Sequence, residues 1–198
     1  MLHSSSDLYG ASKIFFITVL LLRDVGHVVH VVLSEEGALA DQIRNEGVEV
    51  SIVRLGILRR KYFNPQGLIN RFSALKNAHR SLVELVKKKR INHIYSNTTA
   101  VLVGAWVAGD LNIYHTWHIH EIIAQPKWLA WVLGKLIGKY ADQIVVVSEA
   151  VKQFWQPLMP DKELTVVYNG IDYTPYMDPG SFLRKELSIQ QKAKQCSP

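Results

Sequence analysis

The chain has 198 residues, of which 48% are hydrophobic and 20% charged, a balance that is typical of a globular protein with enough apolar material for a core. Its single cysteine excludes an internal disulfide framework and fits a reducing compartment, while a formal net charge of +6 favours anionic partners. The longest apolar run, residues 14–22, is too short to cross a bilayer, and the first residues lack the pattern of a secretory signal. We therefore expect a cytoplasmic protein.

Extended and helical segments alternate along the chain. Residues 1–3 read as the stub of a first strand. The other predicted strands are residues 28–33, 48–55, 91–96, 112–119, 143–147 and 164–168, and the predicted helices are residues 12–23, 38–45, 68–89, 100–108, 127–140 and 149–155. This alternation predicts an α/β fold with a parallel sheet and helices on both faces. Ligands of such sheets bind beyond the carboxyl ends of the strands, so we give most weight to the residues that follow a strand.

Residues 4–13, SSSDLYGASK, connect the first-strand stub to a helix. Gly10 lets a ligand approach the backbone, and the small side chains of Ala11 and Ser12 keep the approach open. The N–H groups of the helix N-terminus suit a phosphate. An ordinary helix cap rich in Ser and Asp explains these residues equally well.

Three histidines lie at the end of the strand that closes with HTWHIHE. Alternation places His118 and His120 on one face of the sheet and His115 on the other. A metal pair, a substrate-binding or catalytic site, and plain packing compete for His118 and His120. A metal needs a third ligand, and Glu121 points to the wrong face if the strand continues. A site at the strand end is therefore favoured over a metal, and packing is favoured for His115.

The helix at residues 127–140 is amphipathic. Trp128, Val132, Leu136 and Tyr140 share one side, and a neighbouring row consists of Lys127, Trp131, Lys135 and Lys139. A tryptophan within a lysine row suits a membrane interface or an anionic lipid. A core helix with a solvated lysine face is the more common explanation of such a pattern.

Two further strand ends matter. Ser148 follows the strand at residues 143–147, where it can cap the next helix or touch a ligand, and capping is the preferred explanation. Asn169-Gly170 is a hairpin signal, but Pro175 and Pro179 follow without an alternating pattern. We conclude that the chain leaves the sheet at residues 169–172.

Together these segments resemble the N-terminal half of a family 4 (group 1) glycosyltransferase of the GT-B fold. The matching segments are Tyr9-Gly10-Ala11, Gly26-His27-Val28, His118-Ile119-His120-Glu121, the strand at 144–148, and residues 167–172 with Tyr176 soon after. The resemblance implies a Rossmann-like N-terminal domain over residues 1–172, with a truncated first strand, and a linker or tail over residues 173–198. Asn169, Gly170 and Asp172 would then mark the domain boundary.

The resemblance also implies an activity. Family members transfer a sugar from a nucleotide diphosphate donor to an acceptor with retention, usually without a metal, so we expect a nucleotide sugar as co-substrate and no cofactor. Gly10 and Ala11 would approach the donor diphosphate, and His120 or His118 would line the cleft near the reacting sugar, with His120 preferred. The lysine row would suit a glycan or lipid-linked acceptor and peripheral contact with the inner membrane face.

The family's glutamate pair and its basic pair for the phosphates belong to a second domain, and no two glutamates here have the family's spacing. We therefore expect a half that is inactive until a donor-binding domain completes it, in cis or in trans. Two alternatives remain open: a noncatalytic acceptor-binding adaptor, and a hydrolase with a metal on His118 and His120. A nucleic acid partner is not expected, because no strand face interleaves basic and aromatic residues.

Overall fold

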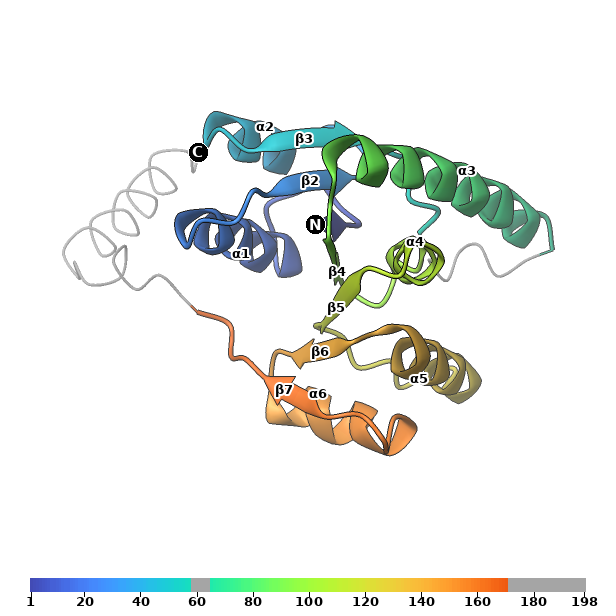
Figure 1. Cartoon of the computed structure of the whole chain (residues 1–198). Helices are drawn as coiled ribbons and strands as arrows, with labels where there is room; N and C mark the ends of the chain where they lie inside the picture. Colours follow the sequence, from blue (N-terminus) through green and yellow to red (C-terminus); the bar gives the residue numbers. More distant parts are fainter. Residues whose placement is uncertain (58–64, 171–198) are drawn as a thin grey trace, which may run out of the picture. The chain divides into compact units, whose positions relative to one another are not determined.

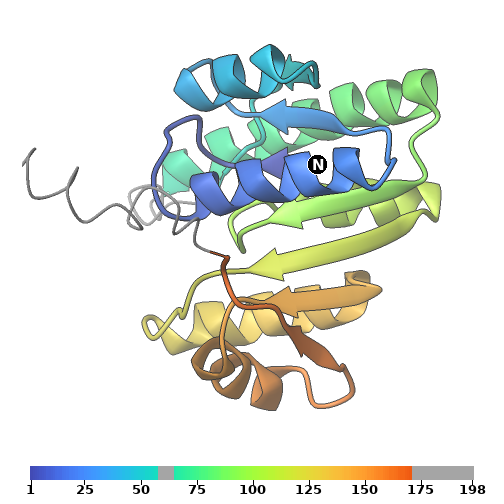
Figure 2. The same ribbon diagram turned by 90° about the vertical axis from the view of Figure 1, so that its left-hand side faces the viewer.

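The computed structural model describes residues 1–57 and 65–170, and its compact unit is Met1–Tyr168. Within the described residues, seven parallel strands form one sheet in the order β3-β2-β1-β4-β5-β6-β7, and Figure 2 shows that they run in a common direction. The strands are β1 (Leu2–His3), β2 (His30–Leu33), β3 (Glu49–Ile52), β4 (His93–Asn97), β5 (Tyr114–Ile119), β6 (Gln143–Val146) and β7 (Leu164–Val166).

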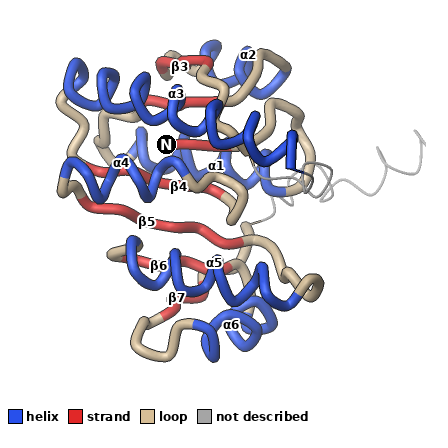
Figure 3. The backbone as a smooth tube through the Cα atoms, turned by 90° about the vertical axis from the view of Figure 1, so that its right-hand side faces the viewer, coloured by secondary structure: helices blue, strands red, loops and turns tan. Residues whose placement is uncertain are grey.

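Helices cover both faces of this sheet (Figures 1 and 3). They are α1 (Ala11–Asp24), α2 (Ala38–Asn45), α3 (Pro65–Lys89), α4 (Val103–Leu111), α5 (Lys127–Tyr140) and α6 (Glu149–Trp155), followed by the short 3-10 helix η2 (Gln156–Leu158). None of the helices in the described part of the chain has the length and hydropathy to span a bilayer.

The alternation of side chains in β2 assigns the helices to their faces. Val31 and Leu33 belong to a core cluster with apolar residues of α1 and α2, whereas Val32 joins Leu2 in a cluster with α3 and α4. Successive residues of a strand point to opposite faces, so α1 and α2 lie on one face and α3 and α4 on the other. A third cluster packs α5 and α6 against β5 and β6. The predicted parallel α/β sheet with helices on both faces is confirmed.

The predicted ends of some elements shift by a few residues. β4 runs on to Asn97, and the helix expected at 100–108 begins at Val103. Thr98 explains the change, because it has a positive φ of 74° and its N–H donates to the carbonyl of His118 at 2.9 Å. This bond holds the start of the β4–α4 connection against β5.

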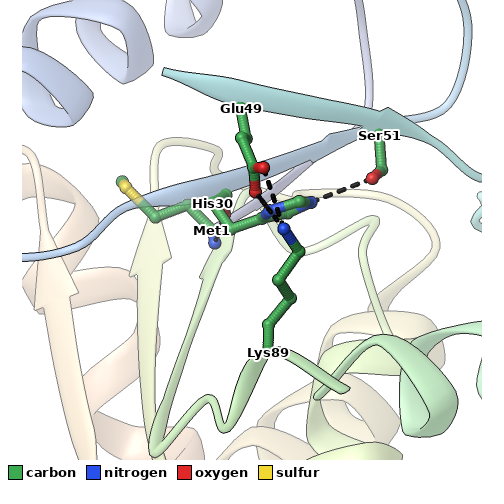
Figure 4. A network of polar contacts seen from close by, with 5 residues as sticks. All are labelled: Met1, His30, Glu49, Ser51 and Lys89. Atoms are coloured by element: carbon green, nitrogen blue, oxygen red, sulfur yellow. Dashed lines mark hydrogen bonds and ion pairs between the residues drawn. The ribbon is translucent and has the colours of Figure 1, made fainter. Parts of the chain in front are cut away.

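A polar network lies at the end of the sheet where the strands begin (Figure 4). His30, the first residue of β2, contacts Glu49 through Nδ1 at 3.0 Å and Ser51 through Nε2 at 2.9 Å. The Nζ atom of Lys89, at the end of α3, lies 2.6 and 2.8 Å from the two carboxylate oxygens of Glu49. Glu49 is largely exposed, so this network orients α3 more than it stabilises the fold.

Candidate functional site

β1 and β4 are neighbours in the sheet. From β1 the chain adds β2 and β3 on one side, and from β4 it adds β5, β6 and β7 on the other, so the order of the strands reverses between β1 and β4. Loops diverge at such a switch point, and ligands of parallel α/β sheets bind there. The side chains of His3, at the end of β1, and of Asn97, at the end of β4, meet at this point with Nδ1 and Nδ2 2.9 Å apart. The switch point is therefore lined by polar groups.

These two residues belong to a chain of hydrogen bonds that reaches from the β1–α1 loop to the end of β5. Ser12 Oγ donates to Asp7 Oδ1 at 3.0 Å, and His3 Nε2 lies 2.9 Å from Ser12 Oγ. At the other end, His120 Nε2 lies 2.8 Å from Asn97 Oδ1. His3, Ser12 and Asn97 are buried, so water does not interrupt the chain at its centre. We call these five residues the polar relay.

His118 and His120 lie on the same face, as the sequence predicted, with ring centroids 4.2 Å apart. Their surroundings differ. His118 is 4% exposed, and its Nδ1 lies 2.6 Å from the hydroxyl of Tyr95, whereas His120 is only half-buried. Burial lowers the pKa of His118 to about 3 and that of His120 to about 4, so both rings are neutral at pH 7. Of the two rings, His120 is therefore the more accessible to a ligand.

His115 has the packing role that the sequence favoured. It is fully buried, and its two ring nitrogens lie 2.9 Å from Ser96 Oγ and 3.0 Å from the carbonyl oxygen of Tyr140. Burial lowers its pKa to about 4. Both nitrogens are occupied by the protein, which leaves His115 no atom for a ligand.

Glu121 joins the loops after β4 and β5. Its Oε2 accepts from the N–H of Thr99 at 3.2 Å, from the Thr99 hydroxyl at 3.4 Å and from the N–H of His120 at 3.3 Å. Burial raises the pKa of this carboxyl. The carboxylate thus fixes the backbone of His120. In the described residues, no group of three or more His, Cys, Asp or Glu side chains is arranged to hold a metal.

The β1–α1 loop presents its backbone at the same edge. Gly10 is the N-cap of α1 with a φ of 51°, a conformation that favours glycine, and the space around its Cα is open. The described residues offer no acceptor to the N–H groups of Gly10 and Ala11, and the first turn of α1 contains no acid. Ser12 does not line the approach as predicted: it is 2% exposed, and its hydroxyl points inward to the relay.

A cavity of about 410 Å³ lies between this loop and the start of α2. Its lining includes Ser5, Asp7, Glu35 and Glu36. Hydroxyls and carboxylates are suitable partners for a ligand rich in hydroxyl groups, and the acids disfavour an anion. The edge of the sheet therefore offers free backbone N–H groups beside a region lined with acceptors.

The outer face of α5 is wider than the sequence pattern indicated. Its buried residues are Ala130, Leu133, Gly134 and Ile137. Lys127, Trp131, Lys135 and Lys139 are exposed as expected, but Trp128 and Val132, which the pattern placed on a separate side, are also 58% and 42% exposed. The two rows are adjacent on the helix and both turn outward, because Ala130, Leu133, Gly134 and Ile137 form the side that faces the core. We call the exposed side chains of both rows the α5 face.

The sequence profile of Glycosyltransferase Family 4 matches residues 10–174. The chain belongs to glycosyltransferase family 4. No curated protein matches it, but solved structures share the fold of this family 4 domain. HepE from Anabaena, in complex with UDP-glucose, is 21% identical with a TM-score of 0.71, over 95% of this chain and 49% of HepE.

Two other solved structures have a similar fold. A glycosyltransferase from Rickettsia africae is 16% identical with a TM-score of 0.60, over 100% of this chain and 49% of its own. MurG from Acinetobacter baumannii is 11% identical with a TM-score of 0.57, over 84% of this chain and 44% of its own. The expected Rossmann-like half of a GT-B fold is confirmed, and the family 4 chain spans about half the length of these structures.

The remaining predicted positions of the family 4 domain lie at its last strands. Ser148 caps α6, because its Oγ accepts from the N–H of Val151 at 3.3 Å. Asn169 and Gly170 are exposed and follow β7 outside regular structure. Asp172 lies outside the described residues, so the domain boundary at 172 stays a prediction.

Sequence reasoning missed His3, Asn97 and Tyr95. Asn97 follows a predicted strand and met the criterion used for the other candidates, but an asparagine followed by two threonines also reads as a turn. His3 and Tyr95 carried no signal, because their partners lie far along the chain: His3 is 94 residues from Asn97, and Tyr95 is 23 residues from His118.

Proposed function

We propose that this domain is the acceptor-side half of a retaining glycosyltransferase that transfers a sugar from a nucleotide diphosphate donor to a glycan or lipid-linked acceptor. The observation that carries the proposal is the family match over residues 10–174, together with a polar switch point at the edge of the sheet where ligands of this fold bind. HepE, whose fold is similar, has been solved with UDP-glucose, with UDP and glucose, and with UDP, which supports a uridine diphosphate sugar as the donor.

In this proposal the leaving diphosphate approaches the N-terminus of α1. Gly10 removes the side chain that would block the backbone, and the N–H groups of Gly10 and Ala11 are directed to the developing negative charge. The helix dipole adds about half a positive charge at this end. The transfer then needs no metal from this domain, and we propose none.

His120 would contact the reacting sugar, while His118 supports it from behind. A neutral imidazole that is half-buried can form a directional hydrogen bond to a sugar hydroxyl without attracting the diphosphate as a cation would. The cavity beside Asp7 and Glu36 suits the hydroxyl groups of an acceptor. Donor and acceptor would thus meet at the switch point.

The α5 face would bring the domain to its acceptor. It combines two exposed tryptophans with three exposed lysines, and α5 contains no acidic residue. Indole rings favour the headgroup region of a bilayer, and lysines are attracted to anionic lipids by about 1 kcal/mol each. We therefore propose peripheral contact with the anionic inner face of a membrane that carries a lipid-linked acceptor.

The chain spans about half of its structural neighbours, so a donor-binding domain would complete the enzyme in cis or in trans. The test captures the native polypeptide from its source cells with an antibody against this domain, and measures its mass and its activity together. We expect a band of about twice 22.5 kDa, because this chain covers only about half of each neighbour. We also expect transfer of labelled sugar from a UDP-hexose to a lipid extract.

The matched variants are His120→Ala and, at an exposed position at the far end of α1, His27→Ala. Loss of His120 should lower the transfer rate by about a hundredfold without unfolding the domain, and loss of His27 should leave the rate unchanged. A band at 22.5 kDa without transfer from any nucleotide sugar would support the noncatalytic adaptor instead. Transfer at the normal rate in His120→Ala would remove this residue from the reaction.

A further inference from the structure

We propose that the polar relay fixes the imidazole of His120 in the tautomer that carries its proton on Nε2, so that Nδ1 faces a bound ligand as a hydrogen-bond acceptor. Asp7, Ser12, His3 and Asn97 are then positioning residues, and they select a ligand hydroxyl over a phosphate oxygen at His120. The catalytic meaning of this assignment rests on the proposed function, but the assignment itself follows from the hydrogen bonds.

The direction of the relay is set at Asp7. Its carboxylate accepts from the Ser5 hydroxyl at 2.8 Å, from the Ser12 hydroxyl at 3.0 Å and from the N–H of Tyr9 at 3.4 Å. The two serine hydrogen bonds lower the pKa of Asp7, so it is ionised at neutral pH and can only accept. Ser12 has one hydroxyl hydrogen, and it is directed to Asp7.

The next two bonds follow from that hydrogen. Because Ser12 Oγ has already donated, it accepts from His3, and the proton of His3 is on Nε2. Burial lowers the pKa of His3 to about 4, so the ring has a single proton and its Nδ1 is an acceptor. Asn97 must therefore donate through Nδ2 to His3, which turns its oxygen towards His120.

The last bond determines His120. Asn97 Oδ1 can only accept, so the proton of His120 is on Nε2, 2.8 Å away. Among the described residues Nδ1 of His120 has no hydrogen-bond partner, and this half-buried ring lies at the edge of the sheet where a ligand binds. An imidazole nitrogen with a free lone pair accepts from a sugar hydroxyl but cannot donate to a phosphate oxygen.

The relay is held rigidly enough to keep this state. His3 stacks on Phe15 of α1 with ring centroids 4.7 Å apart, and Asn97 is fully buried between β1 and β5. Reversing the tautomer of His120 would turn the amide of Asn97 and move the proton of His3 to Nδ1. Ser12 would then face two acceptors, Asp7 Oδ1 and His3 Nε2, with one hydroxyl hydrogen to donate. In a buried network this leaves polar groups unsatisfied, which disfavours the reversed state.

Nitrogen-15 NMR of histidine-labelled protein tests the assignment on the 198-residue chain, because the shifts of the two ring nitrogens report which one carries the proton. At pH 7 we expect a single neutral tautomer at His120 and at His3, with the proton on Nε2. Ser12→Ala removes the link to Asp7 without touching His120, and should raise the minor tautomer of His120 by about tenfold. Ser5→Ala is the matched control, because it removes a hydrogen bond to Asp7 outside the relay and should change nothing.

A second variant tests the relay in case Ser12→Ala does not fold. Asn97→Asp offers a carboxylate to both rings, so the charged form of His120 should persist to a higher pH than in the parent chain. A proton on Nδ1 of His120 in the parent chain, or equal tautomer ratios in the Ser12→Ala and Ser5→Ala variants, would overturn the proposal. None of these measurements needs transferase activity, so a failed transfer assay and a failed relay are separate results.

Discussion

Acid should destabilise this domain well above the pH at which its carboxylates titrate. His3, His115 and His118 are buried, with pKa values of about 4, 4 and 3, whereas an unfolded histidine has a pKa of about 6.5. Because the folded values are the lower ones, the stabilisation is complete above about pH 6.5 and is lost as the pH falls towards 4. Between pH 7 and pH 5 each ring should lower the free energy of unfolding by about 2 kcal/mol, and the three by about 6 kcal/mol.

This magnitude depends little on the folded values, since at pH 5 it is set by protonation of the unfolded chain as long as the folded pKa lies below 5. Glu121, whose pKa is raised by burial, opposes the trend, and Asp7, whose pKa is lowered, contributes only at lower pH. Urea unfolding at pH 7, 6 and 5 measures the effect. Between pH 7 and pH 5, His118→Gln should reduce the mean slope by about 1 kcal/mol per pH unit, and His27→Gln, at an exposed site, should not. A stability at pH 5 within about 1 kcal/mol of that at pH 7 would refute the reasoning.

A Cβ at Gly104 would collide with Ser96 Oγ and Leu2 Cδ1, so Gly104→Ala should destabilise the domain by about 2 kcal/mol in urea unfolding. The control is Gly138→Ala, whose Cβ would meet Met159 only at an ordinary distance of 3.4 Å. It should be neutral or stabilise the domain by less than about 1 kcal/mol. Equal effects would contradict close packing of α4 on β1 and β4. Ser148→Ala should lower stability by about 1 kcal/mol through loss of the α6 cap, whereas Ser148→Gly should lose only a few tenths; identical losses would exclude the cap as the cause. Trp131→Ser should lower the affinity for phosphatidylglycerol vesicles, measured by co-sedimentation, by about tenfold. Tyr114→Ser, at a similarly exposed position at the start of β5, should leave the affinity unchanged. Matching losses would argue against a membrane role for the α5 face.

The sequence predicted the architecture because that information is local. Apolar, β-branched runs such as residues 28–33 and periodic helices such as residues 127–140 specify their own conformation, and their alternation leaves few topologies. The outward turn of Trp128 could not be predicted in this way. It depends on Gly134, where a Cβ would meet Leu158 Cβ at 2.7 Å, so the side of α5 that carries Gly134 faces the core and Trp128 faces away.

The candidate site was predicted as positions but not as chemistry. His120 and Gly10 follow strands, which is a property of the sequence, whereas the proton on His120 is determined by Asp7, Ser12, His3 and Asn97, which lie on two other strand–loop units. A parallel sheet makes this dependence possible, because strands that are distant in sequence end side by side at one edge. If the relay is right, a change at Ser12, which does not contact His120, alters which ligand atom His120 can bind. The hydrogen-bond network then determines which ligand atoms the site can bind. To predict this from the sequence, one must first know that β1, β4 and β5 are neighbours in the sheet.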